Sequence, residues 1–149
     1  MKLSFQKSLF CATEEALQET AAQFATSCSP GTVIGLVGEM GAGKTNFVKG
    51  FAKGLSVREQ ITSPTFSLAQ EYLSGRLPLF HFDFYRLKSE EELFNLGWDD
   101  YFDQKGIIVV EWANRFPDLF DIDTHWLRLA KEAQGRRIEL LASLPNGGP

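Results

Sequence analysis

Apolar residues occur along this chain in two kinds of pattern, one typical of buried strands and one typical of amphipathic helices. Residues 32–37 and 107–110 are predominantly apolar runs, as in strands that a parallel sheet buries on both faces. A threonine cap and two glutamates begin a helix predicted over residues 13–26, where apolar positions recur at helical spacing. A second helix is predicted over residues 44–53, with Gly54 as its C-terminal stop. Strands and helices that alternate in this way indicate an α/β protein.

The remaining strand patterns predict antiparallel pairs at the edges of the sheet. Strands over residues 67–73 and 77–85 are joined by a short glycine-containing turn, which is typical of a hairpin. A terminal hairpin is predicted from residues 126–130 and 137–142. A short first strand is expected within residues 2–9. Together these patterns predict a three-layer α/β fold with a mostly parallel central sheet and antiparallel edge strands.

Local capping and chain-breaking signals place the connections between these elements. Ser89 and Glu92 form a capping box for a short helix that Gly97 closes. Pro64 lies in a polar connection and excludes a regular helix there. The tail, residues 144–149, is expected to be frayed.

Composition and charge narrow the possible functions. At 149 residues, the chain is expected to form a single domain over residues 1–149. Its net charge of −4 disfavours direct binding to nucleic acid. The two cysteines lie far apart and indicate neither a zinc site nor a redox motif. We find no pattern of a signal peptide or a membrane span, so we expect a cytoplasmic protein with no membrane partner.

The candidate chemistry lies between the strand at 32–37 and the helix at 44–53. The sequence there matches G-x-x-x-x-G-K-[ST], the P-loop motif. Its glycines allow backbone turns with positive φ that bring amides against phosphate oxygens. Lys44 brings positive charge to the β- and γ-phosphates, and the Thr45 hydroxyl is a candidate ligand for Mg²⁺. The predicted phosphate site comprises Gly38, Glu39, Met40, Gly41, Ala42, Gly43, Lys44 and Thr45.

The context of the motif favours a P-loop NTPase-like fold, because the motif requires a strand before it and a helix after it. The motif alone does not distinguish ATP from GTP. We expect ATP, because the guanine-reading segment N-K-x-D does not occur in the sequence.

Two acidic residues follow predicted strands. Asp83 lies near the end of the strand at 77–85, and Glu111 directly follows residues 107–110. Both are therefore expected at the carboxyl edge of the sheet, where ligands bind in open α/β proteins. We predict Asp83 and Glu111 as catalytic acids, and Thr45 with Glu111 as the magnesium ligands. The alternative for either acid is a surface carboxylate at a strand end.

Four sequence blocks, in this order and spacing, resemble the TsaE (YjeE) family of bacterial ATPases, which are required for threonylcarbamoyladenosine formation in tRNA. The blocks are G-E-M-G-A-G-K-T at 38–45, T-S-P-T-F at 62–66, H-F-D-F-Y-R-L at 81–87 and E-W at 111–112. The resemblance covers most of the chain, and no block is interrupted. It implies ATP hydrolysis that supports TsaD, which transfers threonylcarbamoyl, and TsaB, so that tRNA is met indirectly through that complex.

The resemblance also implies roles for individual residues. Lys44 and Thr45 match the family residues that bind phosphate and Mg²⁺, and Asp83 and Glu111 match its functional acids. Thr65 lies in a block that resembles a mobile, switch-like loop, which makes it a candidate contact on the γ-phosphate side. The alternative for that block is a connection stiffened by proline.

Several neighbouring residues have two interpretations each. Trp112, Tyr85 and Arg86 are candidates for nucleotide or partner contacts, but core packing fits them equally well. His81 shares a strand face with Asp83, and we interpret it as structural because a lone histidine is more often structural than catalytic.

Two other functions fit the same motif. A small-molecule or nucleotide kinase would use the same loop and a strand-end acid, but usually has a lid with several arginines, and the arginines here are scattered. A nucleotide-gated binding module with negligible turnover would also need a P-loop and a strand-end acid. Phosphate release without an acceptor separates hydrolysis from kinase activity.

Overall fold

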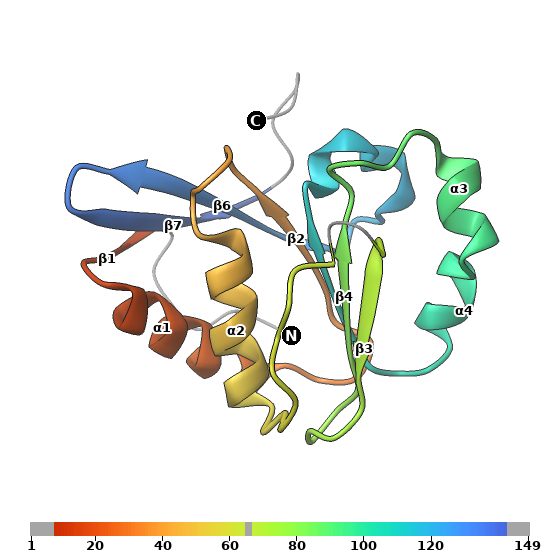
Figure 1. The fold of residues 1–149 in the computed structure, drawn as a ribbon, viewed down its shortest axis with the longest axis horizontal. Coiled ribbons are helices and arrows are strands. Elements are labelled where there is room, and N and C mark those ends of the chain that lie inside the picture. Colours follow the sequence, from red (N-terminus) through yellow and green to blue (C-terminus); the bar gives the residue numbers. More distant parts are fainter. Residues whose placement is uncertain (1–7, 65–66, 143–149) are drawn as a thin grey trace.

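A computed structural model describes residues 8–64 and 67–142. Seven strands form one sheet in the order β1-β7-β6-β2-β5-β4-β3 (Figure 1). The strands are β1 (Ser8–Cys11), β2 (Val33–Val37), β3 (Ala69–Tyr72), β4 (Leu79–Asp83), β5 (Ile107–Glu111), β6 (His125–Glu132) and β7 (Gly135–Leu141). The helices are α1 (Glu14–Ser27), α2 (Lys44–Gly54), α3 (Glu90–Asn95) and α4 (Trp98–Phe102), with 3₁₀ helices η1 (Ala113–Arg115) and η2 (Pro117–Leu119).

The centre of the sheet is parallel and its edges are antiparallel. β6, β2, β5 and β4 run parallel to their neighbours in that series, whereas β3 pairs antiparallel with β4, and β1 and β7 extend the other edge antiparallel. The predicted mixed α/β sheet with antiparallel edges is therefore confirmed. Because β2, β5 and β4 are parallel, their carboxyl ends meet at one edge of the sheet.

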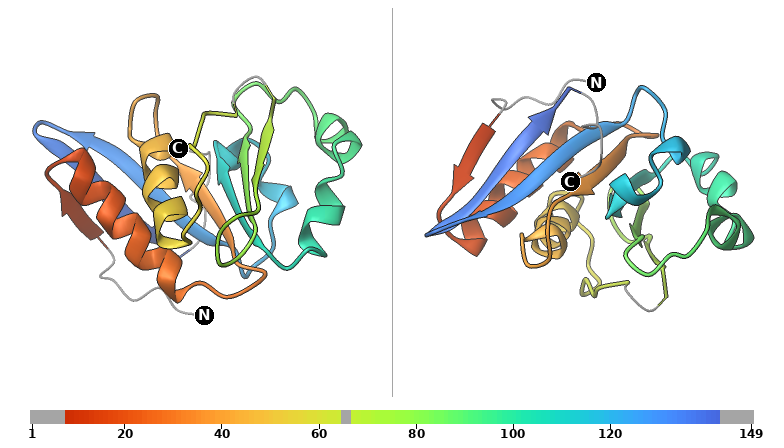
Figure 2. Two further views of the ribbon diagram at one scale, coloured as in Figure 1. Left: turned by 60° about the horizontal axis from the view of Figure 1, so that its bottom comes forward. Right: turned by 90° about the horizontal axis from the view of Figure 1, so that it is seen from above.

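Hydrophobic residues cover both faces of the sheet. One cluster joins the sheet to α1 and α2, which lie side by side along it (Figure 2). A second cluster joins the opposite face to α3, α4 and the segment around η1 and η2. The central strands are consequently buried on both sides, as their uninterrupted apolar runs predict.

The helices begin where the capping residues predict. The Thr13 side chain accepts a hydrogen bond from Ala16 N at 3.0 Å at the start of α1. Ser89 caps α3 in the same way, accepting from Glu92 N at 3.4 Å. These bonds satisfy backbone amides that have no partner within the helix.

The structure corrects several predicted boundaries. The hairpin strands predicted over 67–73 and 77–85 are shorter, and α4 follows Gly97 where we predicted no helix. Gly54 is the last residue of α2 and Leu55 is its C-cap, so the glycine is not the stop itself. A Cβ at Gly54 would lie 2.3 Å from the Ala22 carbonyl oxygen, so the close packing of α1 requires this glycine.

Parts of the predicted termini lie outside the described residues. Of the strand predicted within residues 2–9, only the last two positions are described, and they belong to β1. The predicted tail at 144–149 is also outside the described range. None of the helices in the described part of the chain is both long enough and apolar enough to cross a membrane.

Candidate functional site at the carboxyl edge of the sheet

The glycine-rich loop connects β2 to α2 at the edge where the parallel strands end. Gly38, Gly41 and Gly43 have φ values of 147°, 79° and 104°, which confirms the predicted positive-φ turns. Gly43 is also the N-cap of α2 and has no side chain to cap it. Residues after it therefore present unpaired backbone amides at the positive end of the helix dipole, an arrangement that favours anions.

Lys44 is the first residue of α2, and only 5% of its surface is exposed. Its Nζ atom donates hydrogen bonds to the carbonyl oxygens of Gly38 at 2.7 Å and Glu39 at 2.9 Å. Burial lowers the pKa of Lys44 from its ordinary value, and the negative charges of Glu111, Asp83 and Glu39 oppose that shift. The loop thus holds a desolvated ammonium group directly beside its own backbone.

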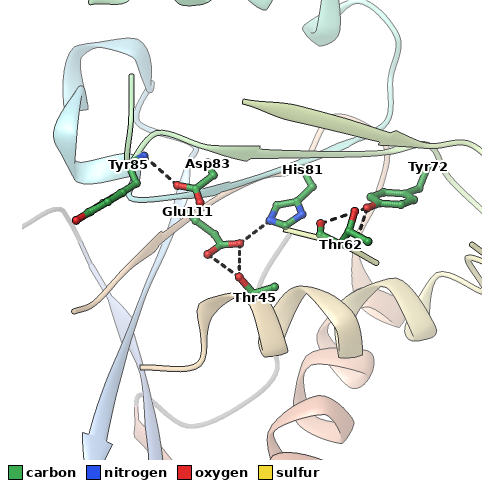
Figure 3. Close-up of polar contacts among 7 residues, drawn as sticks. All are labelled: Thr45, Thr62, Tyr72, His81, Asp83, Tyr85 and Glu111. Carbon is green, nitrogen blue, oxygen red and sulfur yellow. Dashed lines mark hydrogen bonds and ion pairs between the residues drawn. The ribbon is translucent and has the colours of Figure 1, made fainter. Parts of the chain in front are cut away.

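Glu111, at the end of β5, is held from two sides (Figure 3). The Thr45 hydroxyl donates to its carboxylate at 3.0 Å to Oε1 and 2.9 Å to Oε2. On the other side, His81 Nε2 lies 2.6 Å from Glu111 Oε2. Glu111 is 3% exposed, so these contacts replace water around a buried carboxylate.

Asp83 ends β4 and pairs in register with Glu111 on β5. Its Oδ1 atom accepts a hydrogen bond from the Tyr85 amide at 2.9 Å. Because the side chain is 5% exposed and lines the same pocket as Glu111, the two predicted acids lie together at one end of the sheet. Neither is a freely solvated surface carboxylate, so the structure contradicts that alternative.

Trp112 packs beside both Lys44 and Tyr85 at the edge of the site. The Trp112 ring centroid lies 4.3 Å from Lys44 Nζ and 5.1 Å from the Tyr85 ring. Trp112 has a φ of 58°, a conformation that a bulky residue adopts at a cost of about 1–3 kcal/mol. Arg115 stabilises the Tyr85 segment, because its Nη1 donates to the carbonyl oxygens of Phe84, Tyr85 and Leu87 at 2.6, 2.8 and 2.7 Å.

These groups line a pocket of about 690 Å³, a volume typical of small-ligand sites. Its walls come from the glycine loop, the strand ends, the start of α1 and the tip of the β6–β7 hairpin. Met40, Gly41, Gly43, Lys44, Thr45, Asp83, Tyr85, Arg86, Glu111 and Trp112 are among the lining residues.

Three predicted site residues do not line the pocket among the described contacts. Ala42 is fully buried within the loop, Gly38 would place a Cβ 2.3 Å from the Leu129 carbonyl oxygen, and Glu39 contributes its carbonyl to Lys44. These residues shape the loop. Thr65 lies outside the described residues, whereas Ser63 of the same block lines the pocket.

His81, which we interpreted as structural, contacts the site through Glu111. Its alternation with Asp83 already indicates that both face the same side of β4. The parallel pairing of β4 with β5, which places His81 opposite Val109 and therefore diagonal to Glu111, was not available from the sequence pattern.

The described residues thus define an α/β protein with a glycine-rich loop and a polar pocket at the carboxyl edge of a mixed sheet. The family described as "Threonylcarbamoyl adenosine biosynthesis protein TsaE" matches residues 11–138. The chain belongs to the TsaE family. The resemblance inferred from the four sequence blocks is therefore confirmed.

Curated relatives carry the name tRNA threonylcarbamoyladenosine biosynthesis protein TsaE. The Bacillus subtilis protein is 47% identical over 100 residues, covering 67% of this chain and 60% of that protein. The Nostoc protein is 39% identical over 120 residues, covering 78% of this chain and 74% of that protein. The matched part of this chain therefore spans only three fifths of the Bacillus relative.

A solved structure has the same fold. The crystal structure of Bacillus subtilis YdiB superposes with a TM-score of 0.74 at 33% identity, over 89% of this chain and 82% of that one. The mixed sheet and its flanking helices are therefore a shared architecture.

Proposed function

We propose that this protein is a Mg²⁺-dependent ATPase with a P-loop NTPase-like fold that acts in threonylcarbamoyladenosine modification of tRNA. The observation that carries the proposal is the convergence of four groups at one edge of the sheet: the positive-φ loop, buried Lys44, Thr45 and Glu111. Each group has a separate task in phosphoryl chemistry, and the pocket they share is large enough for a nucleotide.

The phosphates of ATP would bind at the loop. The backbone amides of Lys44 and Thr45, the first two residues of α2, supply hydrogen-bond donors. Lys44 now donates to two loop carbonyls, and phosphate oxygens offer its ammonium a stronger, charged acceptor. Lys44 therefore discriminates ligands that carry β- and γ-phosphates from those that carry none.

Magnesium fits the oxygen donors at Thr45 and Glu111. No cluster of three His, Cys, Asp or Glu side chains suited to a metal occurs among the described residues. Mg²⁺ does not need one, because it usually binds one or two protein oxygens and completes its shell with water and substrate phosphates. When bound, the ion neutralises charge that develops on the phosphates.

The acids orient the reacting groups. Glu111 accepts the Thr45 hydroxyl hydrogen and so directs the oxygen lone pairs of Thr45 toward the pocket. Asp83, adjacent on β4, faces the same pocket and is the second acid available to align water. We assign hydrolysis to this pair and phosphate binding to the loop.

ATP is favoured over GTP because the N-K-x-D segment is missing from the sequence. A D-x-x-G string does occur at residues 103–106, although GTPase switches place it after a strand, near the γ-phosphate. Here the string precedes β5, so it lies at the edge opposite Glu111 and does not reach the pocket. It gives no support to a GTPase.

We propose TsaD and TsaB as the partners, with tRNA contacted through their complex. Relatives named for tRNA threonylcarbamoyladenosine biosynthesis support a role in that pathway. The acidic net charge also fits indirect contact with tRNA. We place the activity in the cytoplasm, and we expect slow turnover without the partner proteins.

Four measurements test this proposal. Phosphate release from ATP by the purified chain, with Mg²⁺ and without any acceptor, is expected and would exclude a strict kinase. Lys44→Ala should weaken ATP binding in calorimetry, whereas Lys49→Ala, on an exposed part of the same helix, should not. Unchanged ATP affinity in Lys44→Ala, or equal competition by GTP, would contradict the assignment.

Co-purification with TsaB and TsaD in the presence and absence of ATP tests the partners.

A further inference from the structure

His81 is the one fully buried histidine in the described part of the chain, and it touches the site without lining the pocket. Its side chain is 0% exposed, and its Nε2 atom lies 2.6 Å from Glu111 Oε2. This is the shortest contact that the Glu111 carboxylate makes (Figure 3). The proposed hydrolysis mechanism gives His81 no role, so its position needs a separate explanation.

The hydrogen of this contact belongs to His81 Nε2. The other ring nitrogen, Nδ1, is buried and has no hydrogen-bond partner among the described residues. A proton on Nδ1 would create a buried donor with no acceptor there, and the Nε2 lone pair would then face a carboxylate that offers only acceptors. An Nε2–H that donates to Glu111 avoids both costs.

This donor fixes the rotation of the Glu111 carboxylate. The last torsion of a glutamate side chain is broad, so the backbone alone does not determine which oxygen faces a neighbour. His81 contacts Oε2 only, whereas Thr45 reaches both oxygens. Oε2 therefore contacts both the His81 ring and the Thr45 hydroxyl, whereas Oε1 contacts only the Thr45 hydroxyl among the described residues.

We propose that His81 is a positioning residue that orients Glu111 toward Thr45 and thereby toward the magnesium site. This inference rests on the proposed function, because it assumes that Glu111 and Thr45 serve the metal of an ATPase. Partners that orient metal-site ligands in this way commonly change metal affinity or activity by about 10- to 100-fold when they are removed.

Three variants separate this role from simple packing. His81→Phe fills the space without a donor, and His81→Gln retains an N–H near the position of Nε2. Tyr72→Phe is the matched control: Tyr72 is buried on the same face of the sheet, but its hydroxyl contacts Thr62 and not Glu111. For each variant we would measure the melting temperature, ATP affinity without Mg²⁺, the Mg²⁺ concentration for half-maximal turnover, and kcat.

Relative to wild type, His81→Phe should lower kcat or raise the half-saturating Mg²⁺ concentration by about 10- to 100-fold. Metal-free ATP affinity should stay within about twofold, because the loop and Lys44 are intact, and His81→Gln should recover part of the loss. Equal losses in His81→Gln and His81→Phe, or a loss in Tyr72→Phe of the same size, would overturn the inference while leaving the ATPase assignment intact. A wild-type protein that neither binds nor hydrolyses Mg-ATP would instead overturn the proposed function and this inference with it.

A spectroscopic measurement needs neither metal nor turnover. The sequence contains two histidines, so ¹⁵N spectra of histidine-labelled protein contain two side chains, and His125→Gln identifies the signals of His81. We expect the Nε2–H form at His81, with a shift of that signal in Glu111→Gln. A proton found on Nδ1 would overturn the proposed contact.

Discussion

The two faces of the sheet differ in chemistry, although the same strands form both: one face carries buried polar residues and the other an aromatic cluster. On the face toward α2, the ends of β4 and β5 carry His81, Asp83 and Glu111, all buried and all polar. On the opposite face, Phe80 and Phe82 of β4 pack against the aromatic rings of Trp98 and Tyr101 in α4. Successive residues of one strand therefore belong to a buried polar cluster and to an apolar core.

The two faces therefore contribute differently to the stability of the folded protein. Burying the carboxylates and the histidine costs solvation free energy, which their mutual hydrogen bonds only partly offset. The aromatic face gains free energy from apolar burial and from edge-to-face ring contacts. A strand anchored firmly on one side can hold polar groups in a fixed arrangement on the other.

The largest effect is expected from breaking the aromatic face. Phe82 is fully buried, and its ring centroid lies 5.0 Å from those of Trp98 and Tyr101. Phe82→Ala should lower the free energy of unfolding by about 3–5 kcal/mol, because it leaves a cavity in a tightly packed cluster. Denaturant unfolding measures the loss, and Phe102→Ala, at a partly exposed ring, is the control that should lose much less. A loss below about 1 kcal/mol in Phe82→Ala would remove the distinction between the two faces.

Substitutions on the polar face are expected to lower activity and to leave stability nearly unchanged. Asp83→Asn and Glu111→Gln should each lower ATP turnover by about 100- to 1000-fold, because each removes a charge that orients reacting groups. ATP should still bind through the loop amides and Lys44, and the melting temperature should change little. Parallel assays of hydrolysis and of multiple-turnover threonylcarbamoyl transfer with TsaB and TsaD test this. Near-normal rates of hydrolysis and transfer in either variant would show that the substituted acid has no catalytic role.

Local sequence rules were sufficient to predict most of the elements and the loop. The P-loop motif predicted the turn between β2 and α2 because its pattern lies in adjacent residues, and the positive φ values follow from its glycines. The short helix α4 was missed because a five-residue segment carries too little periodicity to be detected.

The same local rules could not predict contacts between residues on different strands. His81 and Glu111 are thirty residues apart, and only the β4–β5 register brings them within hydrogen-bond distance. The position of Trp112 over Lys44 likewise depends on a φ of 58° that nothing in its neighbours predicts. The residues lining a site can thus be inferred from motifs, whereas the groups that hold those residues in place require the sheet pairing.

A moderate effect is expected where α1 supports the pocket side of the sheet. A Cβ at Gly50 would lie 2.2 Å from the Gln18 carbonyl oxygen, so α2 cannot accept a side chain there without moving from α1. Gly50→Ala should therefore lower the free energy of unfolding by about 1–3 kcal/mol, despite the better helix propensity of alanine. Lys49→Ala, at an exposed neighbouring position, is the control for propensity in the denaturant titration. Stabilisation by Gly50→Ala would show that the two helices adjust without strain.

The smallest effect concerns the charge of Lys44. Burial places the pKa of Lys44 in the folded protein below 10.5, its ordinary value. Between the two values the unfolded chain binds more protons than the folded one, so this group makes stability rise with pH in that window and has no such effect below it. Phosphates bound beside Lys44 should raise its pKa again, so ATP binding should be accompanied by uptake of a fraction of a proton within the window and by none at neutral pH.

Calorimetry in two buffers of different ionisation enthalpy measures that uptake, with Mg²⁺ removed so that only the loop and Lys44 contribute. Lys44→Arg is the matched control, because a guanidinium keeps its charge throughout this range and should show no uptake. Affinity of the wild-type protein should be highest below the pKa of Lys44 and should fall as pH rises through it. Equal proton uptake in wild type and Lys44→Arg would assign the titration to a group other than Lys44.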